Sequence, residues 1–261
     1  MLNTSEGGQA SLVLCEKQDG VAVLTLNRPD KLNAMSGVMR AQFGRHLQSI
    51  EADPEIRIVL LKSNGRAFCV GADTNAMPEN ALSWRERIHL AQQHHTALVK
   101  MDKIVIAAVQ GIAAGGGASL ALAADILIMA DDASLRFPFV RLGLIPDGGC
   151  SFLLQSKLGA PLAHDLMLTG GVLGADEAQR YGLTRRIVPV AGLEAASQTL
   201  IEELSALPAE ALMLTKAVSR QTWTVGMDAA FMHEADAFAL ASTLPGHQQA
   251  RADLLARRKL R

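Results

Sequence analysis

The stretch IVIAAVQGIAAGGGASLALAADILIMA, residues 104–130, decides the fold class. It opens with an apolar run typical of a buried strand and passes through a glycine-rich turn into a helix of small residues ending near Ala124. A second apolar strand, Asp125 to Ala130, follows directly. A strand, a short helical connection and another strand indicate parallel strands joined by a crossover, as in α/β folds.

The same alternation continues on both sides of this stretch. Asp19-Gly20 predicts a hairpin turn between two apolar runs, and Ser36 predicts the cap of a helix with apolar residues at helical spacing. Downstream of Arg141 the strand signals fade, and the C-terminal residues carry helical apolar stripes. The predicted strands are 12–16, 21–26, 56–62, 104–109, 125–130 and 186–189, and the predicted long helices are 36–53 and 84–101. The pattern predicts a mixed, largely parallel sheet in one domain with a helical C-terminal appendage.

Composition narrows the class of protein. The 261 residues carry a formal net charge of -1 and only 4% aromatic side chains, which argues against a nucleic-acid binder. No apolar run approaches the roughly 20 residues of a membrane span, and residues 1–10 do not resemble a secretory signal. Cys15, Cys69 and Cys150 show neither metal-ligand nor disulfide spacing. We therefore expect a soluble cytoplasmic enzyme without a metal, a membrane partner or a nucleic-acid partner.

Two glycine-bearing loops could form a site. Gly115 to Gly117 join a strand to a helix, where exposed backbone amides suit an oxygen that gains negative charge, although glycines there also permit tight packing. The second loop, Ala67 to Asp73, also follows a strand, and Asp73 could simply cap the next helix. If both loops lie at the same end of the parallel strands, their amides could converge on one oxygen.

Four segments together resemble a known family. They are 27–35 (NRPDKLNAM), 67–73 (AFCVGAD), 110–117 (QGIAAGGG) and 142–146 (LGLIP), and the ending 254–259 (LLARRK) fits as well. Their order and spacing resemble the crotonase superfamily, the enoyl-CoA hydratases and isomerases. The resemblance implies an α/β crotonase (ClpP-like) fold of repeated strand-strand-helix turns over residues 1–190. It implies a helical trimerisation region over 191–261, and hence a homotrimer or a dimer of trimers.

The resemblance also assigns site residues. The backbone amides of Ala72 and Gly116 would form an oxyanion hole for the thioester carbonyl of an acyl-CoA. Coenzyme A would enter as part of the substrate, with no other cofactor. The implied substrate-binding residues are Lys31, Leu32, Ala34, Ala67, Phe68, Asp73, Ser119, Phe139 and Lys259, with Arg66 as a further candidate for the phosphates.

The chain departs from the hydratases at two of these positions. Ser119 and Phe139 stand where hydratases carry the two glutamates that handle water, so an efficient two-glutamate hydratase is not expected. Asp147 is the carboxylate that remains near the site. It could be a turn or cap residue, but in the isomerase branches a lone acid here moves the proton.

The sequence therefore favours enoyl-CoA double-bond isomerisation with Asp147 as acid and base. Alternatives are a hydratase or acyl-CoA hydrolase using Asp147, and a catalytically silent acyl-CoA binding protein. Glu79 and Glu86 are the fallback carboxylates. The histidines His89, His94 and His95 are interpreted as a polar helix face rather than as metal ligands. The apolar stripe Ala229 to Leu240 is expected to be exposed unless subunits cover it.

Overall fold

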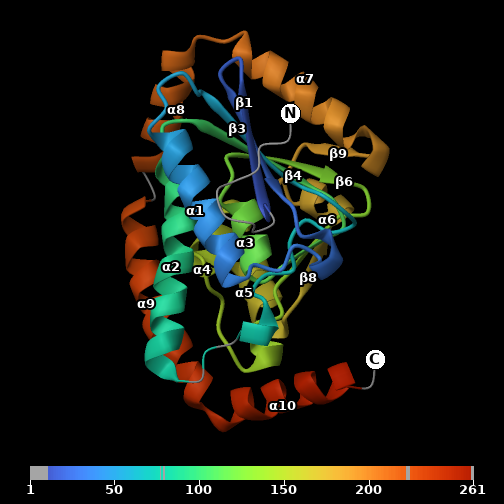
Figure 1. The fold of residues 1–261 in the computed structure, drawn as a ribbon, viewed down its shortest axis with the longest axis vertical. Coiled ribbons are helices and arrows are strands. Elements are labelled where there is room, and N and C mark those ends of the chain that lie inside the picture. Colours follow the sequence, from blue (N-terminus) through green and yellow to red (C-terminus); the bar gives the residue numbers. More distant parts are fainter. Residues whose placement is uncertain (1–10, 77, 79, 222–223, 260–261) are drawn as a thin grey trace.

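The computed structural model describes residues 11–76, 78, 80–221 and 224–259. Two sheets and their covering helices make up the described chain (Figure 1). None of the helices in these described ranges is both long enough and apolar enough to cross a membrane.

The larger sheet has six strands and confirms the predicted mixed, largely parallel arrangement. Its strands in spatial order are β1 (Val13–Gln18), β2 (Val21–Leu26), β3 (Ile58–Ser63), β4 (Ile104–Val109), β6 (Ile126–Ala130) and β9 (Arg186–Val188). The β1–β2 hairpin is antiparallel and every other pair is parallel. Asp19 and Gly20 both adopt positive φ, as a two-residue hairpin turn requires.

A smaller sheet of three short strands continues beyond the carboxyl end of β4. It consists of β5 (Ile112–Ala114), β7 (Ser134–Arg136) and β8 (Val172–Gly174). These strands could not be predicted from the sequence, because three residues are too few to show a periodic pattern. This sheet holds the glycine-rich turn that enters α3.

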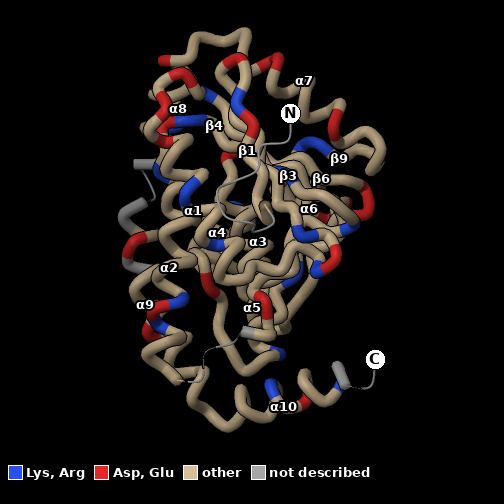
Figure 2. Tube along the Cα trace, in the orientation of Figure 1, with Lys and Arg blue, Asp and Glu red and all other residues tan. Residues whose placement is uncertain are grey.

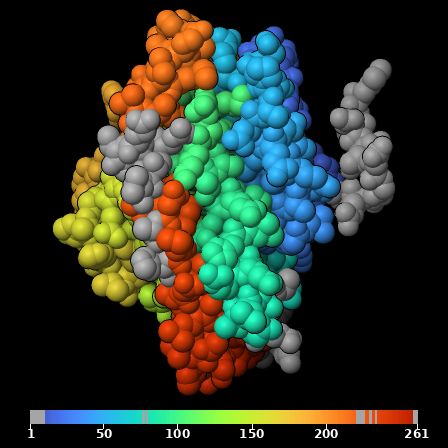
Figure 3. Space-filling model, turned by 90° about the vertical axis from the view of Figure 1, so that its left-hand side faces the viewer, coloured from blue at the N-terminus to red at the C-terminus, as the bar shows by residue number. Residues whose placement is uncertain are grey.

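Helices cover both sheets and form the C-terminal part of the described chain. Their bounds are α1 (Gly37–Glu51), α2 (Ala81–Lys100), α3 (Gly116–Leu122), α4 (Cys150–Leu158), α5 (Ala160–Thr169), α6 (Ala175–Arg180), α7 (Leu193–Ser205), α8 (Ala209–Gln221), α9 (Thr224–Thr243) and α10 (Pro245–Lys259). One face of the molecule shows α1, α2 and α9 side by side (Figure 3). The second helix begins at Ala81, three residues earlier than predicted, because Asn80 caps it.

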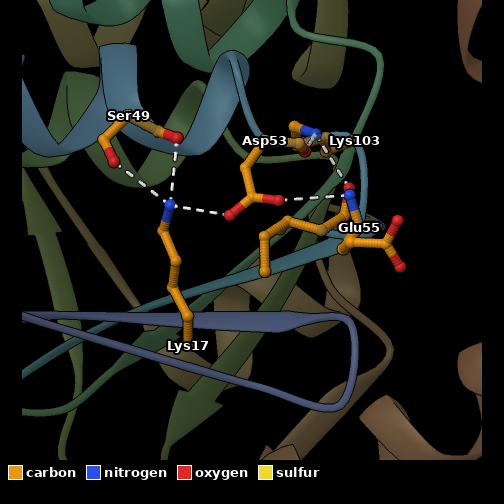
Figure 4. A network of polar contacts seen from close by, with 6 residues as sticks. Lys17, Ser49, Asp53, Glu55 and Lys103 are labelled. Atoms are coloured by element: carbon orange, nitrogen blue, oxygen red, sulfur yellow. Dashed lines mark hydrogen bonds and ion pairs between the residues drawn. The ribbon is translucent and has the colours of Figure 1, made fainter.

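The first helix is fixed at both ends by polar contacts. The Ser36 side chain accepts a hydrogen bond from the Met39 N–H, which confirms the predicted cap. At the other end, Lys17 Nζ on β1 donates to the Ser49 carbonyl at 3.0 Å and pairs with Asp53 Oδ2 at 2.9 Å (Figure 4). Lys103 Nζ donates to the Asp53 carbonyl at 2.6 Å and so ties the same turn to β4.

Charged residues of both signs alternate around the outside in the view of Figure 2. This distribution agrees with the net charge of -1 and shows no basic face on this side of the molecule.

Two expectations about helix faces are wrong because α2 lies between two other helices. His94 and His95 are buried rather than on a solvent-facing polar surface. Part of the Ala229–Leu240 stripe is covered within the chain itself: Phe231, Ala235 and Phe238 are buried, and the Phe238 ring lies 5.0 Å from the Trp84 ring of α2. The side chain of Ala229 lies outside the described residues.

Candidate active site

The two glycine-bearing loops lie side by side at the carboxyl ends of β3 and β4. The Cys69 N–H donates to the Ile112 carbonyl at 3.1 Å, and the Ala114 N–H donates to the Cys69 carbonyl at 2.8 Å. On its other side, the first loop pairs with Met35, whose N–H donates to the Gly71 carbonyl at 2.8 Å. The loops therefore meet in a backbone ladder, as expected for loops that follow neighbouring parallel strands.

Gly71 brings the two candidate oxyanion donors together. Its φ is +86°, and a Cβ there would lie 2.7 Å from the Ala114 carbonyl oxygen and 3.3 Å from the Gly116 nitrogen. Only glycine permits this approach. Neither the Ala72 N–H nor the Gly116 N–H donates to an acceptor in the described part of the chain. Two neighbouring free amides can receive one oxygen that gains negative charge.

Asp147 lies next to these amides. Its Oδ1 is shielded from solvent, has no hydrogen-bond partner among the described residues, and lies 3.7 Å from the position a Cβ would take at Gly116. The alternative interpretation as a helix cap is not what the geometry shows. Gly149 occupies the N-cap of α4, and the Asp147 contact with Cys150 uses its backbone carbonyl.

Burial sets the protonation of the groups around the site. It raises the pKa of Asp147 to about 6, and the charges of Arg40 and Arg87 oppose this rise. His95 lies beneath Gly116, with Nε2 3.5 Å from the Gly116 carbonyl and Nδ1 2.8 Å from the Ala91 carbonyl. Burial lowers the pKa of His95 to about 4, so this ring is neutral at physiological pH.

Ser119 and Phe139, at the two positions where the hydratases carry glutamates, do not offer an acid or a base to a water molecule. Ser119 is buried, and its hydroxyl donates to the Asp147 carbonyl at 2.8 Å. Phe139 is buried with its ring edge 3.8 Å from the Cβ position of Gly115. Ser119 therefore holds the turn that carries Asp147, and Phe139 contributes an apolar wall.

Glu234 on α9 is a buried residue near the site that no sequence motif predicted. Its Oε2 accepts from the Gly149 N–H at 2.8 Å, and its Oε1 accepts from the N–H and the hydroxyl of Ser151. Burial raises the pKa of Glu234 to about 7. The available signal was one carboxylate among apolar helix positions such as Phe231, Ala235 and Phe238.

A cleft of about 580 Å³ opens beside the Ala72 amide. It is lined by the predicted substrate-binding residues Lys31, Leu32, Ala34 and Asp73, by the predicted oxyanion donor Ala72, and by Arg66. The Asp73 carboxylate is engaged, because its Oδ2 pairs with Arg28 at 2.6 Å and its Oδ1 accepts from the Asn75 N–H. Ala67 and Phe68 are buried, so only their backbone could meet a ligand.

The remaining candidates do not join this arrangement. Glu86 is exposed on α2, while Glu79 and the side chain of Lys259 lie outside the described residues. Within the residues that the structure describes, no three His, Cys, Asp or Glu side chains gather as a metal site.

Comparison with known proteins assigns the family. The Enoyl-CoA hydratase/isomerase family model matches residues 16–248. The chain is 34% identical to the 1,2-epoxyphenylacetyl-CoA isomerase of Escherichia coli, over 94% of this chain and 96% of that protein. It is 31% identical to the crotonyl-CoA hydratase of Syntrophomonas wolfei, over 95% and 96%. An enoyl-CoA hydratase structure from Mycobacterium avium subsp. paratuberculosis superimposes with a TM-score of 0.87 at 28% identity, covering 94% of this chain and 99% of that one. The chain therefore belongs to the enoyl-CoA hydratase/isomerase family of the crotonase superfamily.

Proposed function

We propose that this enzyme shifts the double bond of an enoyl-CoA thioester, with Asp147 moving the proton. The observation that carries the proposal is the state of the Asp147 carboxyl, whose Oδ1 lies beside Gly116, shielded from solvent and unpartnered among the described residues. A carboxylate with a pKa near 6 is mostly ionised at neutral pH, yet basic enough to accept a proton.

The reaction follows from this arrangement. A 3-enoyl thioester would place its carbonyl oxygen at the Ala72 and Gly116 amides, which stabilise the dienolate. Asp147 would remove a proton from the α carbon; the electrons of that C–H bond move into the conjugated system and place negative charge on the oxygen. The same carboxylic acid then returns its proton to the γ carbon, which gives the 2-enoyl thioester. Atoms and charge balance without a metal or a redox cofactor.

Coenzyme A would enter as part of the substrate. The 580 Å³ cleft reaches Ala72 from the side that carries Lys31 and Arg66, two cations suited to phosphate groups. We also propose that this enzyme assembles as a homotrimer or a dimer of trimers.

Hydration of a 2-enoyl-CoA is the second candidate, because several relatives carry hydratase names. Against it stand Ser119, whose hydroxyl is committed to the Asp147 carbonyl, and Phe139, which has no polar group. An addition of water needs an acid or a base on each side of the double bond, and one carboxylate serves that need poorly.

The test compares initial rates of two reactions on one preparation. We expect 3-hexenoyl-CoA to be isomerised at rates typical of enzymes, about 10 per second. Crotonyl-CoA hydration is expected to be at least about 100-fold slower, the lower range of what one acid–base group contributes. Hydration at or above the isomerisation rate would refute the proposal.

A further inference from the structure

His247 is buried near the start of α10, and the proposed proton transfer does not use it. The residue is 3% exposed, whereas the other described side chains of α10 are half-buried or exposed. In Figure 1 this helix lies at the end of the molecule away from α7. A buried histidine on an otherwise solvated helix directs attention to what its ring contacts.

The ring contacts the 3-10 turn Val140–Leu142. Its Nδ1 lies 2.7 Å from the Leu142 carbonyl oxygen. Because a carbonyl can only accept, Nδ1 carries the proton and donates it to this bond. The backbone of His247 is equally close: a Cβ at Gly143, whose φ is +66°, would lie 2.5 Å from the His247 nitrogen and Cα. The start of α10 is therefore fitted against this turn by both backbone and side chain.

The 140–142 turn connects two groups of the candidate site. Where the turn begins, the Phe139 carbonyl accepts from the N–H groups of Leu142 and Leu144 at 2.9 and 3.0 Å. The Phe139 ring forms the apolar wall beside Gly115. From Leu144 the chain runs on directly to Asp147. A displacement of this turn would therefore move both the apolar wall and the proposed base.

Other contacts hold Asp147 from the opposite side. Ser119 donates to the Asp147 carbonyl, and Glu234 accepts from the amides of Gly149 and Ser151. These bonds are made to Asp147 itself and to residues after it. The bond from His247 fixes the chain before Asp147.

The His247 ring is fixed on a second side by aromatic packing. Its centre lies 5.9 Å from that of the Trp84 ring at an interplanar angle of 85°, and Trp84 belongs to the apolar cluster that contains Leu144 and Phe238. The second ring nitrogen, Nε2, is buried without a hydrogen-bond partner among the described residues. An apolar side chain could fill the same place without leaving a buried nitrogen unsatisfied. What the histidine adds is the Nδ1–H donor to Leu142.

We infer that His247 is a positioning residue, whose Nδ1–H bond to the Leu142 carbonyl sets the places of Phe139 and Asp147. This inference rests on the proposed acyl-CoA function and extends it, because it gives α10 a part in the geometry of the site. His247 acts through the 140–142 turn, so its loss should affect the rate of the reaction rather than the binding of the thioester.

Three substitutions at His247 isolate the Nδ1–H donor. Asparagine carries its amide nitrogen at the place of Nδ1, glutamine carries it at the place of Nε2, and leucine has no donor. We expect kcat for 3-hexenoyl-CoA isomerisation to fall by about 10 to 100-fold in His247→Leu and His247→Gln, and to recover largely in His247→Asn. The KM, and the calorimetric affinity for the unreactive butyryl-CoA, should change little. His164→Leu, the same substitution at an exposed position on α5, should match the wild type.

The pH profile separates positioning from a merely structural role. Burial raises the pKa of Asp147 to about 6, and this pKa sets the acid limb of kcat/KM. A loosened turn would admit water to the carboxyl, so the acid limb should move to lower pH in His247→Leu and stay in place in His247→Asn. A residue that only stabilises the fold would lower the melting temperature without moving this limb.

The inference would be overturned by a folded His247→Leu protein with wild-type kcat and an unshifted acid limb. If that variant does not fold, the asparagine and glutamine variants decide, and equal kcat values in the two would also overturn it. A wild-type protein that binds butyryl-CoA but isomerises no 3-enoyl-CoA would instead refute the proposed function. The same variants would then be compared in crotonyl-CoA hydration, which would also use the Asp147 carboxyl.

Discussion

One oxygen of the Asp147 carboxyl, Oδ1, is buried and has no hydrogen-bond partner in the described structure. Buried polar atoms are nearly always satisfied in folded proteins, and an exception costs about 1 to 3 kcal/mol. Such a cost at a turn next to two free amides is typical of a functional site, where a substrate supplies the missing partner.

The pH dependence of turnover follows from the pKa of Asp147. The base must be ionised, and burial raises its pKa to about 6. We expect kcat/KM for isomerisation to be constant above pH 7 and to fall about tenfold per unit below pH 6. A profile that stays flat down to pH 4.5, measured with a protein that circular dichroism shows to be folded, would contradict this assignment.

Gly71 gives a second test at the residue scale. Gly71→Ala would place a Cβ 2.7 Å from the Ala114 oxygen in a backbone with φ of +86°. We expect kcat to fall by about 100-fold or more, because the Ala72 amide moves away from the oxyanion position. Gly37→Ala is the control, since a Cβ there has nothing within 4 Å, and its kinetics should match wild type.

Some residues of the candidate site could be predicted from the sequence and others could not. The family resemblance pointed to Asp147, Ala72 and Gly116, each of which belongs to a short motif, and the structure places Asp147 and the Ala72 loop close to Gly116. Glu234 could not be predicted. It is a single charged residue in a helix, and its partners Gly149 and Ser151 come from an element far away in the chain.

At the scale of elements, the turn 146–149 is held from two sides. Ser119 on α3 donates to the Asp147 carbonyl, and Glu234 on α9 accepts from Gly149 and Ser151 at the start of α4. Helix α9 therefore reaches the candidate site and helps to hold the turn that carries its base.

Removal of Glu234 should show whether this residue orients the Asp147 turn without affecting the binding of the substrate. Glu234→Ala leaves the Gly149 and Ser151 amides unpaired, so we expect the free energy of unfolding to fall by about 1 to 3 kcal/mol. It should also lower kcat with little change in KM, while Glu234→Gln, which retains one acceptor, should recover part of kcat. Glu210→Ala, at an exposed position on α8, is the control. An unchanged kcat in a destabilised Glu234→Ala protein would limit Glu234 to a structural role.

The strands differ in how well the local sequence pattern predicts them. The strands of the large sheet were found within about two residues, as is usual for segments with strong apolar runs. The strands β5, β7 and β8 were not found, since their three-residue length is defined by pairing partners rather than by their own sequence.

At the scale of the whole molecule, α2 is enclosed between α1 and α9, and this packing already buries Phe231, Ala235 and Phe238. Other apolar residues of the C-terminal helices stay exposed, including Met232 at 63%, Leu240 at 64%, and Leu214 and Val218 on α8. Exposed apolar side chains of this number on neighbouring helices are typical of a subunit interface.

We therefore predict a trimer or a dimer of trimers. Light scattering at micromolar concentration should give three or six times the chain mass of 27.8 kDa. Leu240→Glu should shift the mass towards the monomer, whereas Leu82→Glu, at an exposed position on α2, should not. A wild-type monomer at this concentration would contradict the prediction.

Whether Asp147 moves the proton is tested most directly by Asp147→Asn in heavy water, with exchange of the α hydrogen of a 3-enoyl-CoA followed by NMR beside turnover. The amide keeps the size of the side chain but cannot accept the proton. We expect exchange and isomerisation to fall together by about 100 to 10,000-fold, while affinity for the thioester and the melting temperature are retained or increased. A folded Asp147→Asn protein with near-normal exchange and turnover would contradict the assignment and direct the search to Glu79 or Glu86.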